Sequence, residues 1–252
     1  MDVLIVVATS AEARRLADLP ARTVVCGVGP VSAALATQRA LLSGPRPNLV
    51  INAGIGGAFT ESALTIGTAA VASQMVYGDL GAWDGEAFLG LSDLRLSVLP
   101  GGENSGLFPA WEGSRALASR LELAYGPFIT VSGVTGSAGQ AQRLLARFPG
   151  ALVEGMEGAG VAQAAQMHGV PCTEIRGVSN LVGPRERSAW QIGAALDALH
   201  GALAGLLRAP EETWPRPGLR SATSDQAASA NPTSTGNGTM ASDWTATGDL
   251  DA

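Results

Sequence analysis

The chain has 252 residues, of which 46% are hydrophobic and 15% are charged, so it can bury a substantial core and is not disordered as a whole. Its 16 basic residues, all arginine, are outnumbered by 22 acidic ones, and this balance lacks the basic footprint of a nucleic-acid-binding protein. No apolar run approaches the roughly 20 residues of a membrane span, and the acidic start does not fit a signal peptide. We therefore expect a soluble, cytoplasmic protein with no nucleic-acid or membrane partner.

Cysteine and histidine are too few for a metal site or a disulfide framework. The chain contains only Cys26, Cys172, His168 and His200, and their spacing matches no zinc-binding pattern. Two isolated cysteines suit a reducing compartment, which agrees with the expected location. We expect no metal and no cofactor.

The composition divides the chain near residue 210. Residues 211–252 are rich in Ser, Thr, Ala, Gly, Asn and Pro and carry few apolar side chains, so burial there cannot offset the entropy cost of ordering. We predict a folded domain over residues 1–210 and a disordered, low-complexity tail over residues 211–252. Trp214 and Trp244 could dock on the domain, but a solvated tail is the expectation.

Within residues 1–210, short β-branched runs alternate with helical stretches rich in Ala and Leu. We predict strands at 3–7, 23–26, 49–52, 68–74, 128–134, 151–154 and 173–178, and helices at 11–18, 31–42, 115–122, 140–148, 158–168 and 189–207. The strands are continuously apolar, as expected when helices cover both sheet faces. This pattern predicts an α/β fold, a three-layer α/β/α sandwich around a mixed sheet, with ligands beyond the carboxyl ends of the strands.

The loop after the first strand contains Thr9 and Glu12, which fit a Thr-x-x-Glu capping box. A capping box only stabilises the start of a helix and requires no catalytic role. The alternative is that Glu12 is a general base at the edge of the sheet.

Two glycine-rich loops come next. Gly27-Val28-Gly29-Pro30 suggests a dinucleotide site, but Ser32 replaces the third glycine and no ribose-binding acid follows, so a tight turn before a helix is the simpler interpretation. The second loop, after residue 52, contains Gly54, Ile55 and Gly56. Its backbone could cradle an anion or a ribose, or it could be only a sharp strand exit.

Three later loops also follow strands. Residues 132–139 are small and polar and include Thr135, Gly136 and Ser137. Glu157 lies at the start of an apparently buried, Ala-rich helix, where it could bind a ligand or only complement the helix dipole. Beyond the last strand, Asn180 could be a site residue or only a turn residue.

Taken in order, these segments resemble the nucleoside phosphorylase and nucleosidase superfamily, whose members cleave N-glycosidic bonds of nucleosides. The most specific element is Met-Glu followed about 20 residues later by Arg-x-x-Ser-Asp/Asn. The resemblance spans residues 1–208 and implies a nucleoside phosphorylase-like fold and a homo-oligomer. It rests on Glu12, the glycines of residues 54–57, Met156-Glu157 and Arg176-x-x-Ser179-Asn180.

Within the superfamily the chain looks most like the futalosine hydrolases of menaquinone biosynthesis. That likeness implies hydrolysis of the N-glycosidic bond of futalosine, with water as co-substrate and hypoxanthine and dehypoxanthinylfutalosine as products. The alternatives are another purine nucleosidase, of the methylthioadenosine/S-adenosylhomocysteine or inosine type, and a catalytically silent nucleoside-binding protein. The likeness lies in residues 77–82, in Thr135-Gly136-Ser137-Ala138 and in Gly183-Pro184-Arg185.

The resemblance also implies a role for each residue. Glu12 matches the carboxylate that activates water, Glu157 matches the one that grips the ribose 2′- and 3′-hydroxyls, and Asn180 matches the position that handles the purine. Two carboxylates and a hydrogen-bonding partner suit a reaction that builds positive charge on the sugar and negative charge on the base. The expected substrate-binding residues are Met156, Ser179, Arg176, Gly54, Ile55, Gly56, Thr135, Gly136 and Ser137.

Two departures from the adenine-specific nucleosidases bear on the substrate. Asn180 replaces Asp and offers one acceptor and one NH₂ donor, which suits a 6-oxopurine. Gly136 replaces an aromatic residue, so Phe59 or Trp83 could stack on the base instead. Arg176, Arg185 or Arg187 could bind the carboxylate of futalosine. Phosphorolysis is disfavoured because residues 54–59 contain no Arg and Glu12 would repel phosphate.

Overall fold

The computed structural model describes residues 2–102, 104–210 and 214, all of which belong to one compact unit, Met1–Pro217. The predicted tail lies outside the described residues, apart from Trp214. In the described part, no helix is long and apolar enough to cross a membrane.

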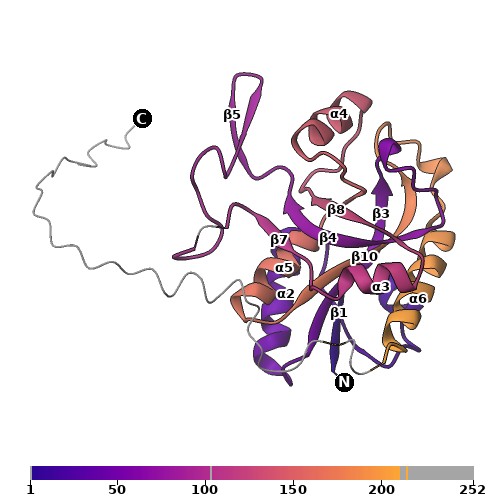
Figure 1. The fold of residues 1–252 in the computed structure, drawn as a ribbon. Coiled ribbons are helices and arrows are strands. Elements are labelled where there is room, and N and C mark those ends of the chain that lie inside the picture. The colour runs from indigo at the N-terminus through magenta and orange to yellow at the C-terminus, as the bar shows by residue number, and fades with distance from the viewer. Residues whose placement is uncertain (1, 103, 211–213, 215–252) are drawn as a thin grey trace, which may run out of the picture. The chain divides into compact units, whose positions relative to one another are not determined.

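An eight-stranded mixed sheet forms the centre of this unit (Figure 1). Its pairings include a closed path, because β10 pairs with both β3 and β4, β4 pairs with β8, and β9 joins β8 to β3. A separate two-stranded hairpin projects from it. The sheet strands are β1 (Val3–Val7), β2 (Arg22–Val25), β3 (Leu49–Ala58), β4 (Ala69–Tyr77), β7 (Leu107–Pro109), β8 (Ala124–Thr130), β9 (Val153–Gly155) and β10 (Cys172–Leu181), and the hairpin strands are β5 (Gly81–Asp84) and β6 (Ala87–Gly90).

Helices cover both faces of the sheet, as the apolar strands predict. Along β1, Val3, Ile5 and Val7 pack with α1, α3 and α6, whereas Leu4 and Val6 pack with α2 and α5. The predicted three-layer α/β/α arrangement is therefore confirmed. The helices are α1 (Ser10–Arg15), α2 (Pro30–Ser43), α3 (Ser114–Arg120), α4 (Ala138–Arg147), α5 (Gly158–Met167) and α6 (Ile192–Leu207), with short 3₁₀ turns η1 (Thr60–Ser62) and η2 (Arg187–Ala189).

The predicted loop after residue 52 is wrong, because β3 continues to Ala58. The glycines are needed there for close packing between strands: a Cβ on Gly56 would lie 2.6 Å from Cγ1 of Val153 on the neighbouring strand β9. Likewise β10 runs on to Leu181, past the predicted strand end at residue 178, with a register shift between Val178 and Asn180. Both extensions carry site residues inside the sheet and not on free loops.

The expectation of a wholly solvated tail does not hold for Trp214. Its ring stacks on Trp111 at 6.0 Å with an interplanar angle of 11°, and its Nε1 donates to the carbonyl of Ala209. Only 8% of Trp214 is exposed. Packing therefore includes Trp214, which lies four positions beyond the predicted domain end at 210.

Candidate active site

Arg176 is the centre of a buried polar cluster, although it lies on a central strand, β10. Only 2% of it is exposed. Its Nε donates to Glu174 at 2.7 Å, its Nη2 donates to Asn52 at 2.6 Å and to Glu157 at 3.0 Å, and its Nη1 donates to the carbonyl of Ile55 at 3.0 Å. Burial alone lowers the pKa of Arg176, but the charges of Glu174 and Glu157 outweigh it and raise that pKa above its ordinary value. The guanidinium is thus fixed and charged.

Glu157 is buried at the start of α5, but its side chain does not cap that helix. One carboxylate oxygen accepts from Arg176, and the other accepts from the backbone N–H of Gly29 at 3.2 Å. Gly29 has a φ of 94°, a conformation that glycine adopts readily. The loop at residues 27–30, interpreted from sequence as a simple turn, therefore also holds Glu157 in place.

Glu12 completes the predicted capping box at the start of α1. Its Oε2 accepts from the N–H and hydroxyl of Thr9, both at 2.9 Å, and its own N–H donates to Thr9 at 3.2 Å. The second carboxylate oxygen, Oε1, accepts from the N–H of Ile55 at 3.2 Å. Glu12 is only 6% exposed, so its carboxylate is fixed between α1 and β3.

Gly54 separates the two charged groups that flank it. A Cβ atom at this position would lie 2.7 Å from Oε1 of Glu12 and 2.7 Å from Nη1 of Arg176. The fold therefore brings together five predicted site residues from four separate segments: Glu12, Gly54, Ile55, Glu157 and Arg176. The expected anion cradle is not open at Ile55, because its N–H is already bonded to Glu12.

Asn180 lies near the end of β10, opposite Gly57 in the strand register. The Ser179 hydroxyl is 2.8 Å from Oδ1 of Asn180 and 3.2 Å from the carbonyl of Gly56, so it can donate to either. Nδ2 of Asn180 donates to the carbonyl of Leu181 at 2.9 Å. Asn180 is half-buried, as is Met156, which precedes Glu157 in the chain. Each amide atom of Asn180 keeps one further hydrogen-bonding position for a ligand.

Thr135, Gly136 and Ser137 make contacts elsewhere. The N–H and hydroxyl of Thr135 both donate to buried Glu154. The N–H of Gly136 donates to Gln140 at 2.9 Å, and Ser137 caps α4. None of these bonds reaches Glu12, Arg176 or Glu157. Glu154, the partner of Thr135, pairs with Gly57 of β3 in the sheet.

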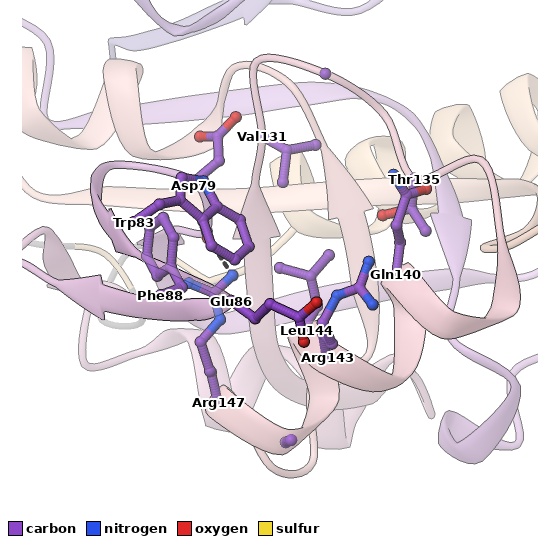
Figure 2. Close-up of a pocket in the computed structure, with 13 residues that line it drawn as sticks. Asp79, Trp83, Glu86, Phe88, Val131, Thr135, Gln140, Arg143, Leu144 and Arg147 are labelled. Atoms are coloured by element: carbon purple, nitrogen blue, oxygen red, sulfur yellow. Dashed lines mark hydrogen bonds between the residues drawn. The ribbon is translucent and has the colours of Figure 1, made fainter.

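A cavity of about 400 Å³ lies between the β5–β6 hairpin and α4 (Figure 2). Trp83 and Phe88 face it from the hairpin, and Arg147 lies 4.0 Å over the Phe88 ring and donates to the carbonyl of Gly78 at 2.6 Å. Thr135 lines this cavity, but Glu12, Glu157 and Asn180 do not. The cavity is therefore not where the carboxylates converge.

Two further expectations need correction. Phe59 is fully buried against Ile129 and Val131, so it cannot stack on a base from this position. Arg176 is occupied by four acceptors and cannot bind a substrate carboxylate. Arg185 lies 5.7 Å over the ring of Trp190, and its predicted role stays open.

Sequence reasoning missed Asn52 and Glu174. Both are buried polar residues in apolar strands, where a polar side chain is costly unless it is paired, and that signal could have found them. Asn52 also donates from Nδ2 to the carbonyl of Val6 at 3.1 Å, so it ties Arg176 to β1. Among the described residues, no group of three or more His, Cys, Asp or Glu could hold a metal ion.

Comparison with known proteins shows the family to which this chain belongs. The model of the phosphorylase superfamily matches residues 4–209, almost the whole described unit. The chain belongs to the phosphorylase superfamily. A futalosine hydrolase of Streptomyces coelicolor is 45% identical over 192 residues, which are 75% of this chain and 78% of that protein.

Solved structures of a nucleosidase and of a futalosine hydrolase share the fold. The S-adenosylhomocysteine nucleosidase of Streptococcus pyogenes aligns with a TM-score of 0.70 at 22% identity and covers 83% of this chain and 98% of its own. The futalosine hydrolase of Helicobacter pylori aligns with a TM-score of 0.69 at 19% identity and covers 82% of this chain and 97% of its own. The fold alone therefore does not distinguish S-adenosylhomocysteine nucleosidase activity from futalosine hydrolase activity.

Proposed function

We propose that this chain hydrolyses the N-glycosidic bond of futalosine and releases hypoxanthine and dehypoxanthinylfutalosine. The observation that carries the proposal is the convergence of Glu12 and Glu157 on either side of Gly54 and Arg176. The 45% identity to the Streptomyces coelicolor futalosine hydrolase supports this substrate over the nucleosides of the other relatives.

The two carboxylates have different tasks in this mechanism. Glu157 accepts hydrogen bonds from the ribose 2′- and 3′-hydroxyls while Arg176 and Gly29 hold it in place. Glu12 accepts a proton from a water molecule whose oxygen bonds to C1′ as the C1′–N bond of the nucleoside breaks. The buried negative charges stabilise the positive charge that builds on the sugar ring.

Asn180 receives the leaving purine. Its amide offers an NH₂ donor to O6 of hypoxanthine and a carbonyl acceptor to N7–H. The departing purine takes the N7 proton from solvent water, because the carbonyl of Asn180 has none to give, and Glu12 later returns its own proton to solvent. Ser179 supports the amide through its 2.8 Å contact with Oδ1. A site matched to a 6-oxo group disfavours a 6-amino base by ~10²-fold or more, because its polar atoms would be left unpaired.

Water and not phosphate is the expected nucleophile. The N–H of Ile55 is bonded to the Glu12 carboxylate, and a phosphate placed there would meet that negative charge. For the substrate's own carboxylate, Arg185 and Arg187 remain as binding residues, and replacing both with Ala should raise KM for futalosine but leave inosine a poor substrate.

The proposed setting is menaquinone biosynthesis in the cytoplasm, with the chain acting as a homo-oligomer. These points follow from the proposed substrate and the superfamily resemblance.

The test measures purine release from futalosine, aminodeoxyfutalosine, inosine and methylthioadenosine in phosphate-free buffer. Hypoxanthine from futalosine, without release from the 6-amino nucleosides, is expected. Adenine release would contradict the role given to Asn180. A requirement for added phosphate would contradict hydrolysis, and release from none of the four would favour a silent nucleoside-binding protein.

A further inference from the structure

Glu174 is a third carboxylate at the cluster, and the reaction proposed above does not use it. It lies two residues before Arg176 on β10, so both side chains point to the same face of the strand. Its side chain is only 2% exposed, and its Oε1 accepts from Nε of Arg176 at 2.7 Å. Glu174 also pairs with Asn52 in the strand register, and Asn52 holds the other end of the guanidinium.

The residues around Glu174 leave room for its buried carboxylate. Its second oxygen, Oε2, is buried without a hydrogen-bonding partner among the described residues. A Cβ atom on Gly158, the first residue of α5, would overlap this carboxylate, so glycine leaves the space that the carboxylate fills. Burial raises the pKa of Glu174, Arg176 offsets that rise only in part, and the charge of Glu157 adds to it. An uncompensated buried carboxylate is costly, so Arg176 and the positive end of α5 are what stabilise its charge.

The charges around Arg176 bear on what Glu157 can do. A guanidinium bonded to Glu157 alone would neutralise the carboxylate that faces the sugar. With Glu174 on its Nε side, the same guanidinium is already paired at 2.7 Å, and Glu157 at 3.0 Å keeps an excess of negative charge. Glu174 also fixes the guanidinium plane, because with Nε occupied the Nη2 atom stays directed at Glu157 and Asn52.

We propose that Glu174 is a positioning residue for the proposed hydrolysis: through Arg176 it keeps Glu157 both oriented and effectively negative toward the ribosyl cation. The inference rests on the proposed function, because Glu157 must face a sugar that becomes positively charged. The effect belongs to the transition state, where that charge develops, and not to binding of the neutral nucleoside.

Two substitutions separate charge from shape. Glu174→Gln keeps the shape and an acceptor for Nε but removes the charge, whereas Glu174→Asp keeps the charge but withdraws it by one methylene. We expect kcat for hypoxanthine release to fall about 10-fold to 100-fold in the Gln variant and only about threefold in the Asp variant, with KM within about twofold in both. A purely structural role predicts the opposite ranking, because Gln fits the buried space better than Asp.

The controls keep each outcome decisive. Asp197→Asn removes one negative charge from an exposed pair with Arg15 and should leave kcat unchanged. Rates are expressed per folded molecule, measured by near-ultraviolet circular dichroism. If the Gln variant does not fold, the Asp variant carries the test, and a kcat that is lowered tenfold or more although the charge is retained contradicts the proposal.

The two failures are distinguishable. A wild-type protein that releases no hypoxanthine contradicts the proposed function together with this inference. The other failure is an active wild type whose Gln variant has the same kcat, with or without a change in KM. That result contradicts the role of Glu174 and leaves the proposed function standing.

Discussion

The carboxylate of Glu12 accepts the backbone N–H of Ile55 at 3.2 Å and thereby joins the first turn of α1 to the middle of β3. The same side chain closes the capping box with Thr9. If it is also the base, Glu12→Gln should lower kcat by ~10²-fold or more, because an amide cannot take the proton from water. Steady-state hydrolysis of futalosine measures this loss.

The matched control for Glu12 is Thr9→Ala, which removes the capping hydroxyl and keeps the carboxylate. It should lower the free energy of unfolding by about 1 kcal/mol and keep kcat within about tenfold of wild type. Equal losses of kcat in the two variants would mean that Glu12 matters only as a cap.

Gly54→Ala should damage the site without creating a cavity or removing a charge. The new methyl would lie 2.7 Å from both Glu12 and Arg176, so one of the two must move. We expect kcat to fall at least about tenfold, since shifts near 1 Å in catalytic groups are costly. Gly201→Ala is the control, because nothing lies within 4 Å of that Cβ position. Alanine there should stabilise helix α6 and raise the free energy of unfolding by about 0.5–1 kcal/mol.

Trp214→Ala should destabilise the folded unit. Its ring stacks on Trp111 at 6.0 Å and is 8% exposed, so truncation leaves a cavity and costs about 3 kcal/mol. Urea denaturation measures the change. Trp83→Ala, at a residue that is 63% exposed, should cost less than about 1 kcal/mol, and equal costs for both variants would show that the stacking contributes little.

The stability of the wild type should depend on pH through Glu154. Burial raises the pKa of Glu154 above its ordinary value of 4.5, although two bonds from Thr135 lower it in part. The folded protein thus keeps this proton to a higher pH than the unfolded chain does, so the free energy of unfolding falls as the pH rises from 4.5 through the folded-state pKa.

Glu154→Gln removes this titration. The unfolding free energy of the variant minus that of the wild type should therefore increase with pH across that window and be constant above it. Denaturant titrations of both proteins at closely spaced pH values measure the difference. A difference that is constant or decreases with pH contradicts the assignment.

The strands and helices that form the layers were largely predictable, because their apolar runs and capping residues are local signals. The segments at Gly54 and at Asn180 were not, since a glycine-rich or polar run typical of a loop becomes strand only when a neighbouring strand pairs along it. The β5–β6 hairpin was also missed: its residues are mostly exposed, and the Trp83–Phe88 contact that accompanies it is not a local pattern.

For the site, the sequence predicted the charged residues better than their partners. Glu12, Arg176 and Glu157 stood in segments whose order matched a family, and the fold brings them together. Gly29 and Asn52 come from distant segments and each contacts the cluster's charged groups through one hydrogen bond, so no spacing along the chain marked them. Glu174 is different: it lies two residues before Arg176 on one strand, and that spacing places both side chains on the same face.

The closed path of strand pairings has a consequence for how the protein assembles. β10 lies between β3 and β4 and is the last strand of the described chain, so the path cannot close until residues 172–181 have been synthesised. Arg176 lies on β10 and is therefore synthesised long after Glu12. A nascent chain that ends before β10 exposes unpaired edges on β3 and β4, and such edges favour aggregation. Protein truncated before residue 172 should therefore depend on chaperones, whereas the full chain should refold unaided.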